Sequence, residues 1–234
     1  MYGRISAYLH KAYNSPGKSY FRSMTDALIT AEKLLQAEAV RLNPKEPFTW
    51  ASGWKSPIYC DNRKVLSLPF IRDYIKSELC NVVFDKYPDT ELIAGVATAG
   101  IAWGAMVADQ LKLPFIYVRP KPKEHGLGNQ IEGAWIKGQK TVVIEDLIST
   151  GKSSLQVVEV IRKAEMEVLG MVSIFNYQFE LANQAFSQAE VPYFSLTNYP
   201  SLLSLAVKKN MIRPEEEEVL LKWRSDPANW KGLS

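Results

Sequence analysis

Two adjacent acids beside a hydroxyl-rich turn are the residues best suited to chemistry in this chain. Glu145 and Asp146 follow the β-branched run 141–144 and precede the turn 147–154. Such a run is typical of a buried parallel strand, and a helical pattern of apolar residues follows Gly151. Free N–H groups at the start of a helix attract phosphate, whereas carboxylates suit sugar hydroxyls and Mg²⁺. The stretch therefore predicts a site for a sugar phosphate.

Two other interpretations of the stretch were weighed. The triplet Gly151-Lys152-Ser153 suggests a nucleotide-binding P-loop, but that motif requires a glycine five residues before Gly151, where this chain has Asp146. We therefore reject the P-loop. The remaining alternative is an ordinary strand, turn and helix with an acid pair at the surface.

The order of residues in 141–154 resembles the phosphoribosyl diphosphate (PRPP) binding motif of the type I phosphoribosyltransferases. Both have an apolar strand, two acids, two apolar residues and then Ser-Thr-Gly. The resemblance implies that the acids bind ribose hydroxyls and that the turn binds the 5′-phosphate, with Ser154 as a further hydroxyl donor. The PRPP-binding residues that it implies here are Glu145, Asp146, Leu147, Ile148, Ser149, Thr150, Gly151, Lys152 and Ser153.

A charged segment without an apolar period carries Arg119, Lys123 and His125. We expect a mobile exposed loop, and loops with such side chains commonly close over anionic ligands. The segment resembles the catalytic loop of the orotate phosphoribosyltransferase family. The resemblance implies a homodimer in which these three catalytic residues bind the diphosphate of PRPP across the interface. Pro120 stands where some members carry a lysine, and whether Lys121 supplies that charge is left open. A solvated basic loop without a catalytic role is the alternative.

Small residues at positions 97–100 lie between an apolar run and a helical pattern. Small side chains let the backbone approach a ligand closely. In the resembling family, main-chain N–H groups at this turn bind the diphosphate. The resemblance therefore implies Thr98, Ala99 and Gly100 as further PRPP-binding residues.

The segment 48–63 is similar to the hood that covers orotate in the same family. Tyr59 offers a flat ring to a pyrimidine, and Arg63 or Lys55 are alternatives for binding the orotate carboxylate. The resemblance further implies that Ser149 contacts orotate. Simple packing is the alternative for the aromatic residues of this segment.

Two departures from the family pattern concern the orotate carboxylate. This chain has Ala51 where some members carry a lysine, and Asn176 and Tyr177 where some carry an arginine after a strand. The sequence therefore leaves open which residue binds this carboxylate.

The composition excludes several classes of protein. The net charge of +3 is small and the basic residues are dispersed, which argues against a nucleic-acid partner. No apolar run is long enough to span a membrane. Cys60 and Cys80 are too few and too distant for a disulfide scaffold or a zinc site, so we expect a soluble protein of a reducing compartment, the cytoplasm.

The alternation of helical and strand patterns predicts an α/β fold. We expect a type I phosphoribosyltransferase-like parallel sheet flanked by helices, with a small N-terminal hood and with ligands beyond the carboxyl ends of the strands. Residues 1–23 are expected to be a flexible extension and residues 24–234 a single domain. That domain would comprise a hood at about 24–65, a core at about 66–215 and a C-terminal helical segment.

More local expectations accompany this fold. Thr25 is expected to cap an N-terminal helix, and 70–84 to form another helix. Strands are expected at 92–97, 114–118 and 168–175. The acidic run 215–218 is interpreted as a solvated first turn of a helix.

The resemblance implies a pentosyltransferase that converts orotate and PRPP into orotidine 5′-phosphate and diphosphate in pyrimidine (UMP) biosynthesis. Mg²⁺ would be held mainly by PRPP, with Glu145 and Asp146 nearby and no certain protein ligand. A purine phosphoribosyltransferase shares the PRPP motif and is one alternative, against which the hood and the charged loop argue. A non-catalytic regulator that senses PRPP is another, although the loop retains its cations.

Overall fold

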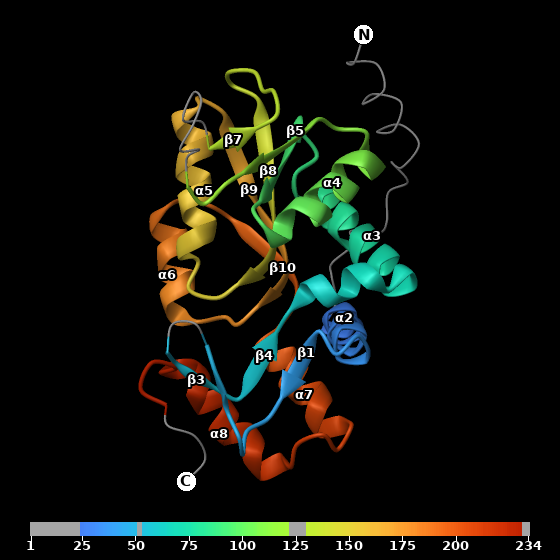
Figure 1. Cartoon of the computed structure of the whole chain (residues 1–234), viewed down its shortest axis with the longest axis vertical. Helices are drawn as coiled ribbons and strands as arrows, with labels where there is room; N and C mark the ends of the chain where they lie inside the picture. The colour runs from blue at the N-terminus through green and yellow to red at the C-terminus, as the bar shows by residue number, and fades with distance from the viewer. Residues whose placement is uncertain (1–23, 51–52, 122–129, 231–234) are drawn as a thin grey trace.

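A computed structural model describes residues 24–50, 53–121 and 130–230 of the chain (Figure 1). The expected extension at residues 1–23 lies outside these described residues. The helix expected after Thr25 is α2 (Met24–Gln36), which begins one residue before the expected cap. Thr25 therefore lies within the first turn and does not precede it.

The centre of the molecule is a six-stranded sheet in the order β10-β9-β8-β5-β6-β7. All neighbouring strands are parallel except β6 and β7, which are antiparallel. The strands are β5 (Leu92–Val96), β6 (Phe115–Val118), β7 (Ile131–Glu132), β8 (Lys140–Ile148), β9 (Glu167–Asn176) and β10 (Tyr193–Asn198). This largely parallel sheet confirms the expected α/β class.

Helices cover both faces of the sheet, as Figure 1 shows. The flanking helices are α3 (Pro69–Lys86), which precedes β5, and α4 (Ala99–Leu111), α5 (Lys152–Lys163) and α6 (Glu180–Gln188), which connect parallel strands. One hydrophobic cluster joins the sheet to α2, α3 and α4, and a second joins it to α5 and α6. The sheet is therefore buried on both sides, which explains the β-branched run of β8.

Strand β8 is longer than the sequence pattern predicts. The expected strand ended at Ile144, but β8 continues through the acid pair to Ile148. The reason is its neighbour β9, which pairs with β8 as far as the partners Ile148 and Asn176. The pairing with β5, by contrast, ends at Ile144. The acids thus lie on an ordered strand that extends beyond β5.

Short strands and terminal helices form the hood region at the lower end of Figure 1. Strand β1 pairs with β4, and β2 with β3, both antiparallel. The elements are β1 (Val40–Leu42), β2 (Phe48–Thr49), β3 (Lys55–Ser56), β4 (Ile58–Cys60), the 3₁₀-helix η1 (Asn62–Ser67), α7 (Tyr199–Lys208) and α8 (Pro214–Ser225). Helix α2 packs against α7 and β10, and α7 packs against α8. The C-terminal helices therefore pack with the N-terminal part of the chain.

An aromatic cluster fastens these parts together. We use this name for Trp50, Tyr177, Phe179, Tyr199 and Trp223. The rings of Tyr177 and Phe179 are stacked, with centroids 5.3 Å apart and planes at 8°. Trp223 meets Trp50 edge-on at 5.8 Å and is completely buried. Offset and edge-to-face contacts of this kind stabilise beyond the area they bury.

The polar atoms of three cluster rings donate to main-chain carbonyls. These bonds run from Trp50 Nε1 to Ile58 O at 3.2 Å, from Trp223 Nε1 to Lys55 O at 3.1 Å and from the Tyr199 hydroxyl to Leu220 O at 3.2 Å. Two of the three acceptors, Ile58 and Lys55, lie on the short strands β4 and β3. The cluster therefore ties the hood strands to helix α8 and to the end of β9.

The acidic run at the start of α8 is only partly solvated. Glu216 is buried and accepts hydrogen bonds from the Arg213 main-chain N at 2.9 Å and from Arg213 Nη2 at 3.0 Å. The expectation of a solvated first turn is therefore wrong for Glu216, because its carboxylate caps the helix. Glu215 is exposed and fits the expectation. Glu218 lies in the second turn, where it is exposed and pairs with Lys222 at 2.9 Å.

Candidate active site

The start of α4 lies directly against the end of β8. A Cβ atom added at Gly100 would lie 2.6 Å from Ile144 O and 3.5 Å from Glu145 Cα, so only glycine permits this approach. Thr98 is the N-cap residue of α4 and Ala99 is its first residue. The structure therefore brings the expected diphosphate turn beside the expected ribose acids.

The start of α5 closes the other side of the same strand end. Gly151 is the N-cap residue of α5 and has a φ of 78°, which favours glycine. A Cβ atom there would also lie 2.8 Å from Phe186 Cε2 on α6. The turn 149–151 is thus held tightly, and the first N–H groups of α5 are available to an anion.

The two acids of the motif have different surroundings. Glu145 is only 5% exposed. Its Oε1 accepts from the main-chain N of Asp146 at 2.9 Å, and its Oε2 accepts from Ser154 Oγ at 3.1 Å. Asp146 is half-buried. Glu145 is therefore held by the protein, and Asp146 is the acid better placed to meet a ligand.

Ser154 does not behave as the sequence predicts. We expected it to donate to a phosphate, together with the other hydroxyls of the turn. Its side chain is instead buried and donates to Glu145. The helical spacing contained the signal, because Ser154 shares its face of α5 with the buried Val157, Val158 and Ile161.

Burial disfavours the state in which Glu145 and Asp146 are both ionised. It raises the pKa of Glu145 well above the ordinary carboxyl value, and the adjacent Asp146 carboxylate raises it further. Burial also raises the pKa of Asp146, against the hydrogen bond to Glu145 and the nearby Arg63 guanidinium. Carboxyl groups in this state gain from a ligand that brings hydroxyl donors or positive charge.

The hood reaches the acid pair through Asn62, a residue that is not among the predicted binding residues. Asn62 is completely buried, and its Nδ2 donates to the main-chain oxygen of Asp146 at 2.7 Å. Its neighbour Cys60 donates its thiol proton to Asn62 Oδ1 at 3.4 Å. A short polar residue between Tyr59 and Arg63 was the available signal, but its partner is distant in sequence.

The predicted orotate-binding residues Tyr59 and Arg63 lie on either side of Asn62 in the chain. Arg63 forms a two-bond pair with Asp61, with Nε to Oδ1 at 2.7 Å and Nη2 to Oδ2 at 3.1 Å. The guanidinium carbon of Arg41 lies 5.5 Å from the centroid of the Tyr59 ring. One face of the Tyr59 ring is therefore in a cation–π contact with Arg41.

Lys55, the other residue considered for the orotate carboxylate, lies on the exposed hairpin. Its Nζ donates to Thr49 Oγ1 at 2.8 Å. The structure does not bring Lys55 into contact with the acid pair.

Arg119 lies at the base of the charged loop and beside the PRPP turn of its own chain. Together with Ala97 and Ser153 it lines a small cavity of about 30 Å³. Its Nη1 lies 3.7 Å from Glu132 Oε1, and its main-chain N donates to Gln130 O at 2.9 Å. Lys123 and His125 lie outside the described residues.

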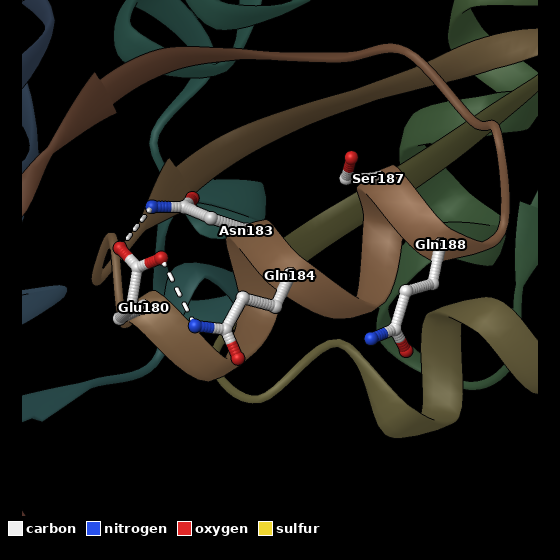
Figure 2. A pocket seen from close by; sticks show the side chains of 5 residues that line it. All are labelled: Glu180, Asn183, Gln184, Ser187 and Gln188. Atoms are coloured by element: carbon white, nitrogen blue, oxygen red, sulfur yellow. Dashed lines mark hydrogen bonds between the residues drawn. The ribbon is translucent and has the colours of Figure 1, made fainter.

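A hollow of about 370 Å³ lies along α6 (Figure 2). Its lining consists of Glu180, Asn183, Gln184, Ser187 and Gln188, all from one helix. Glu180 already accepts from the amides of Asn183 and Gln184 at 3.4 and 3.3 Å. None of the predicted site residues lines this hollow, so we do not consider it the active site.

Comparison with known proteins identifies the family. A family model of the phosphoribosyl transferase domain matches residues 71–194. The orotate phosphoribosyltransferase of Bacteroides fragilis is 53% identical over 201 residues, which cover 86% of this chain and 95% of that protein. The same enzyme of Bacillus subtilis is 52% identical and covers 86% of this chain and 93% of its own length. The chain belongs to the orotate phosphoribosyltransferase family. The resemblance stated from the sequence is thus confirmed.

Solved structures confirm the type I phosphoribosyltransferase-like fold. Orotate phosphoribosyltransferase from Aeropyrum pernix superimposes with a TM-score of 0.67 at 29% identity, over 78% of this chain and 98% of that one. UMP synthase of Leishmania donovani gives 0.71 at 26% identity, over 85% of this chain and 42% of that one. Adenine phosphoribosyltransferase from Leishmania tarentolae gives 0.54 at 21% identity, a likeness of fold alone.

Among the described residues, no helix combines the length and the apolar character that crossing a membrane requires.

Proposed function

We propose that this chain transfers the phosphoribosyl group of PRPP to orotate, giving orotidine 5′-phosphate and diphosphate in pyrimidine biosynthesis. The observation that carries this proposal is the convergence of three segments on residues 144–146 of β8. The start of α4 approaches Ile144 through Gly100, the start of α5 contacts Glu145 through Ser154, and the hood contacts Asp146 through Asn62. The three parts of the reaction therefore each have a neighbouring segment at this strand end: α4 for the diphosphate, α5 for the ribose phosphate and the hood for the base.

The PRPP molecule is assigned to the two helix starts. Main-chain N–H groups of Thr98, Ala99 and Gly100 bind its diphosphate, and the turn 147–153 binds its 5′-phosphate. Asp146 accepts hydrogen bonds from the ribose hydroxyls. Glu145, whose oxygens already accept from Asp146 N and Ser154, contributes through the orientation of this strand end.

The reaction is a displacement at the ribose C1. A ring nitrogen of orotate gives up its proton and forms a bond to C1, while the bond from C1 to the diphosphate oxygen breaks. The electron pair of the broken bond leaves on the diphosphate, which accepts the proton directly or through water. Cations near that oxygen stabilise the transition state more than the ground state, because its negative charge grows during the reaction. Arg119, Lys123 and His125 supply this stabilisation. We place Lys123 and His125 across a dimer interface from the acids that they serve, whereas Arg119 lies beside the PRPP turn of its own chain.

Orotate is assigned to the hood, between Tyr59, Arg63 and Ser149. Arg63 uses Nε and Nη2 on Asp61, and we assign its Nη1 to the orotate carboxylate. Tyr177, which stands where some family members carry an arginine, lies in the aromatic cluster. Burial raises its pKa, so its hydroxyl stays neutral and provides no positive charge for the carboxylate.

We propose that Mg²⁺ is held mainly by the substrate. Both oxygens of Glu145 already accept protein hydrogen bonds, which leaves Asp146 as the nearby carboxylate. Mg²⁺ typically binds through one or two carboxylates, water and substrate phosphates. When bound, the ion neutralises charge on the diphosphate.

The homodimer is supported by an apolar patch at the start of α3. Phe70 is 92% exposed and Leu68 is 38% exposed, although large apolar side chains are normally covered. A second copy of the chain is the occupant we propose. Light scattering should give twice the chain mass for the wild type, and Phe70→Ser should lower the mass or weaken the association. Unchanged association in this variant would exclude the patch from the interface.

The cytoplasmic location is also a proposal. It is supported by the cysteines, because both Cys60 and Cys80 are free thiols.

The test of the function is the loss of orotate absorbance after addition of PRPP and Mg²⁺. Adenine, hypoxanthine and uracil are supplied in parallel reactions as alternative bases. Turnover of orotate alone is the expected result. Turnover of a purine would replace the proposal with purine phosphoribosyl transfer, and PRPP binding without any turnover would favour a PRPP-sensing regulator.

A further inference from the structure

Beyond the end of β5, strand β8 receives a hydrogen bond from a side chain of the hood. The pairing of β8 with β5 stops at Ile144, so Asp146 lies in the part of β8 that extends further. There the Asp146 carbonyl accepts from Asn62 Nδ2 at 2.7 Å, across 84 positions of sequence. The donor is completely buried, so water does not compete for this bond.

The chemistry of its partners fixes the orientation of the Asn62 amide. A main-chain carbonyl can only accept, so the NH₂ group must face Asp146. The Oδ1 atom at the other end accepts from the Cys60 thiol at 3.4 Å. Burial raises the pKa of that thiol well above its ordinary value, and the Asp146 charge adds to the effect, so Cys60 keeps its proton and remains a donor.

The bond joins the two halves of the proposed active site. Tyr59 and Arg63, assigned to orotate, lie within three residues of Asn62 in the chain. Asp146, assigned to the ribose, lies at the other end of the bond. The base nitrogen must approach C1 in line with the leaving oxygen, and a displacement of about 1 Å between reacting groups costs on the order of a hundredfold in rate.

We propose that Asn62 is a positioning residue that sets the hood against the PRPP strand through its bond to the Asp146 main chain. It contacts neither substrate and acts through Asp146 and the hood. This inference rests on the proposed transfer reaction, because the two halves matter only if base and sugar must meet. PRPP binding itself depends less on Asn62, because α4 and α5 are positioned by the close contacts of Gly100 and Gly151.

Two variants separate the donor from the volume of the side chain. Asn62→Ala removes both, whereas Asn62→Asp keeps the volume and replaces the NH₂ donor by an acceptor. Asn198→Ala is the matched control, because it removes an asparagine whose Oδ1 accepts from the Ser201 N–H at 2.9 Å at the start of α7. Turnover is measured by orotate absorbance, and the affinity for PRPP with Mg²⁺ by calorimetry.

Both Asn62 variants should lose on the order of tenfold to a hundredfold in kcat, while the Kd for PRPP changes by less than about threefold. Asn198→Ala should keep both values even if its melting temperature falls. Full kcat in Asn62→Ala would overturn the proposal, because that variant lacks the donor. Equal loss of kcat and PRPP affinity would also overturn it.

A measurement on the wild type makes the test independent of how the variants fold. PRPP with Mg²⁺, added without orotate, should slow amide hydrogen exchange in the hood segment 57–63, because the ligand orders the strand to which Asn62 is bonded. Unchanged exchange in 57–63 would overturn the coupling. If the wild type failed to convert orotate, the proposed reaction would fall, whereas the exchange result would still decide whether the hood senses PRPP.

Discussion

The aromatic cluster and the acid pair are both buried, but their polar groups are used in opposite ways. In the cluster, the indole N–H groups of Trp50 and Trp223 reach main-chain acceptors, and the rings pack edge-on. At the acid pair, two carboxyl groups stand next to each other with little water, and burial raises the pKa of both. The first arrangement stabilises the fold, and the second strains it.

The difference shows that the aromatic cluster stabilises the folded state, whereas the acid pair lowers its stability. Sites that bind charged or hydroxylated ligands commonly break the rules that govern cores, and the rest of the molecule compensates. Here the compensation comes from the aromatic cluster, which holds the hood segment that must cover the base. Substitutions in the cluster should therefore cost stability, and substitutions at the acid pair should cost activity.

The largest effect on stability is expected for Trp223→Ala. Removing a completely buried Trp typically costs about 3–5 kcal/mol, and each kcal/mol lowers the melting temperature of a protein of this size by roughly 2–4 °C. Trp223→Phe is the control, because it keeps a ring but loses the N–H donor to Lys55 O. Thermal denaturation should show a clearly smaller loss for this variant. Equal losses would show that the hydrogen bond, not the packing, carries the stability.

Asp146→Asn, in contrast to Trp223→Ala, should cost activity and not stability. The amide removes the negative charge that meets the ribose side of the transition state, and kcat/KM should fall by about 10²–10³, as for other groups placed at developing charge. Stability should be unchanged or higher, because a half-buried charge is removed. Asp109→Asn is the control, since the Asp109 side chain is 81% exposed and pairs with Lys112. A melting temperature that fell together with activity would contradict the proposal that the acid pair serves activity and the aromatic cluster serves stability.

Glu145→Gln tests the strain of the acid pair through pH. Burial raises the folded-state pKa of Glu145 above the unfolded value of about 4.3. The wild type therefore has the full contribution of this group below that value and loses it as pH rises through the folded pKa. Glutamine has no such titration but still accepts from Asp146 N.

The melting temperature of Glu145→Gln should therefore exceed that of the wild type at pH 8, and the gap should shrink towards pH 5. Ser187→Ala, which changes an exposed residue of α6, serves as the control and should show no such change of the gap with pH. A gap for Glu145→Gln that stayed constant from pH 5 to pH 8 would contradict the raised pKa.

The two regions also differ in how far they can be predicted from sequence. The acid motif is local, so the strand, the acids and the helix start at Gly151 were all predicted from neighbouring residues. The aromatic cluster is assembled from Trp50, Tyr177 and Phe179, Tyr199, and Trp223, which no local pattern connects. The tie from Asn62 to Asp146 was missed for the same reason, because it spans 84 positions.

Within the motif, the errors arose where tertiary contacts decide. The end of β8 was placed at Ile144, because only pairing with β9 carries the strand on to Ile148. Outside the motif, Gly100 stays a predicted ligand contact, and the structure adds a second reason for glycine there, its close approach to Ile144 O. Patterns of residue type predict which elements form, but the closest distances depend on the packed partner.

The smallest effects, and the sharpest contrast, are expected for the neighbouring serines 153 and 154. Ser154→Ala removes the buried donor to Glu145 and should cost about 1 kcal/mol in the free energy of unfolding, measured with urea. Ser153 is exposed and lines the cavity beside Arg119. Ser153→Ala should leave stability unchanged and raise the KM for PRPP a few-fold, because one phosphate donor is lost. The opposite result would mean that the buried Ser154 binds the ligand and the exposed Ser153 stabilises the fold. The ligand site would then begin one residue further along α5 than we propose.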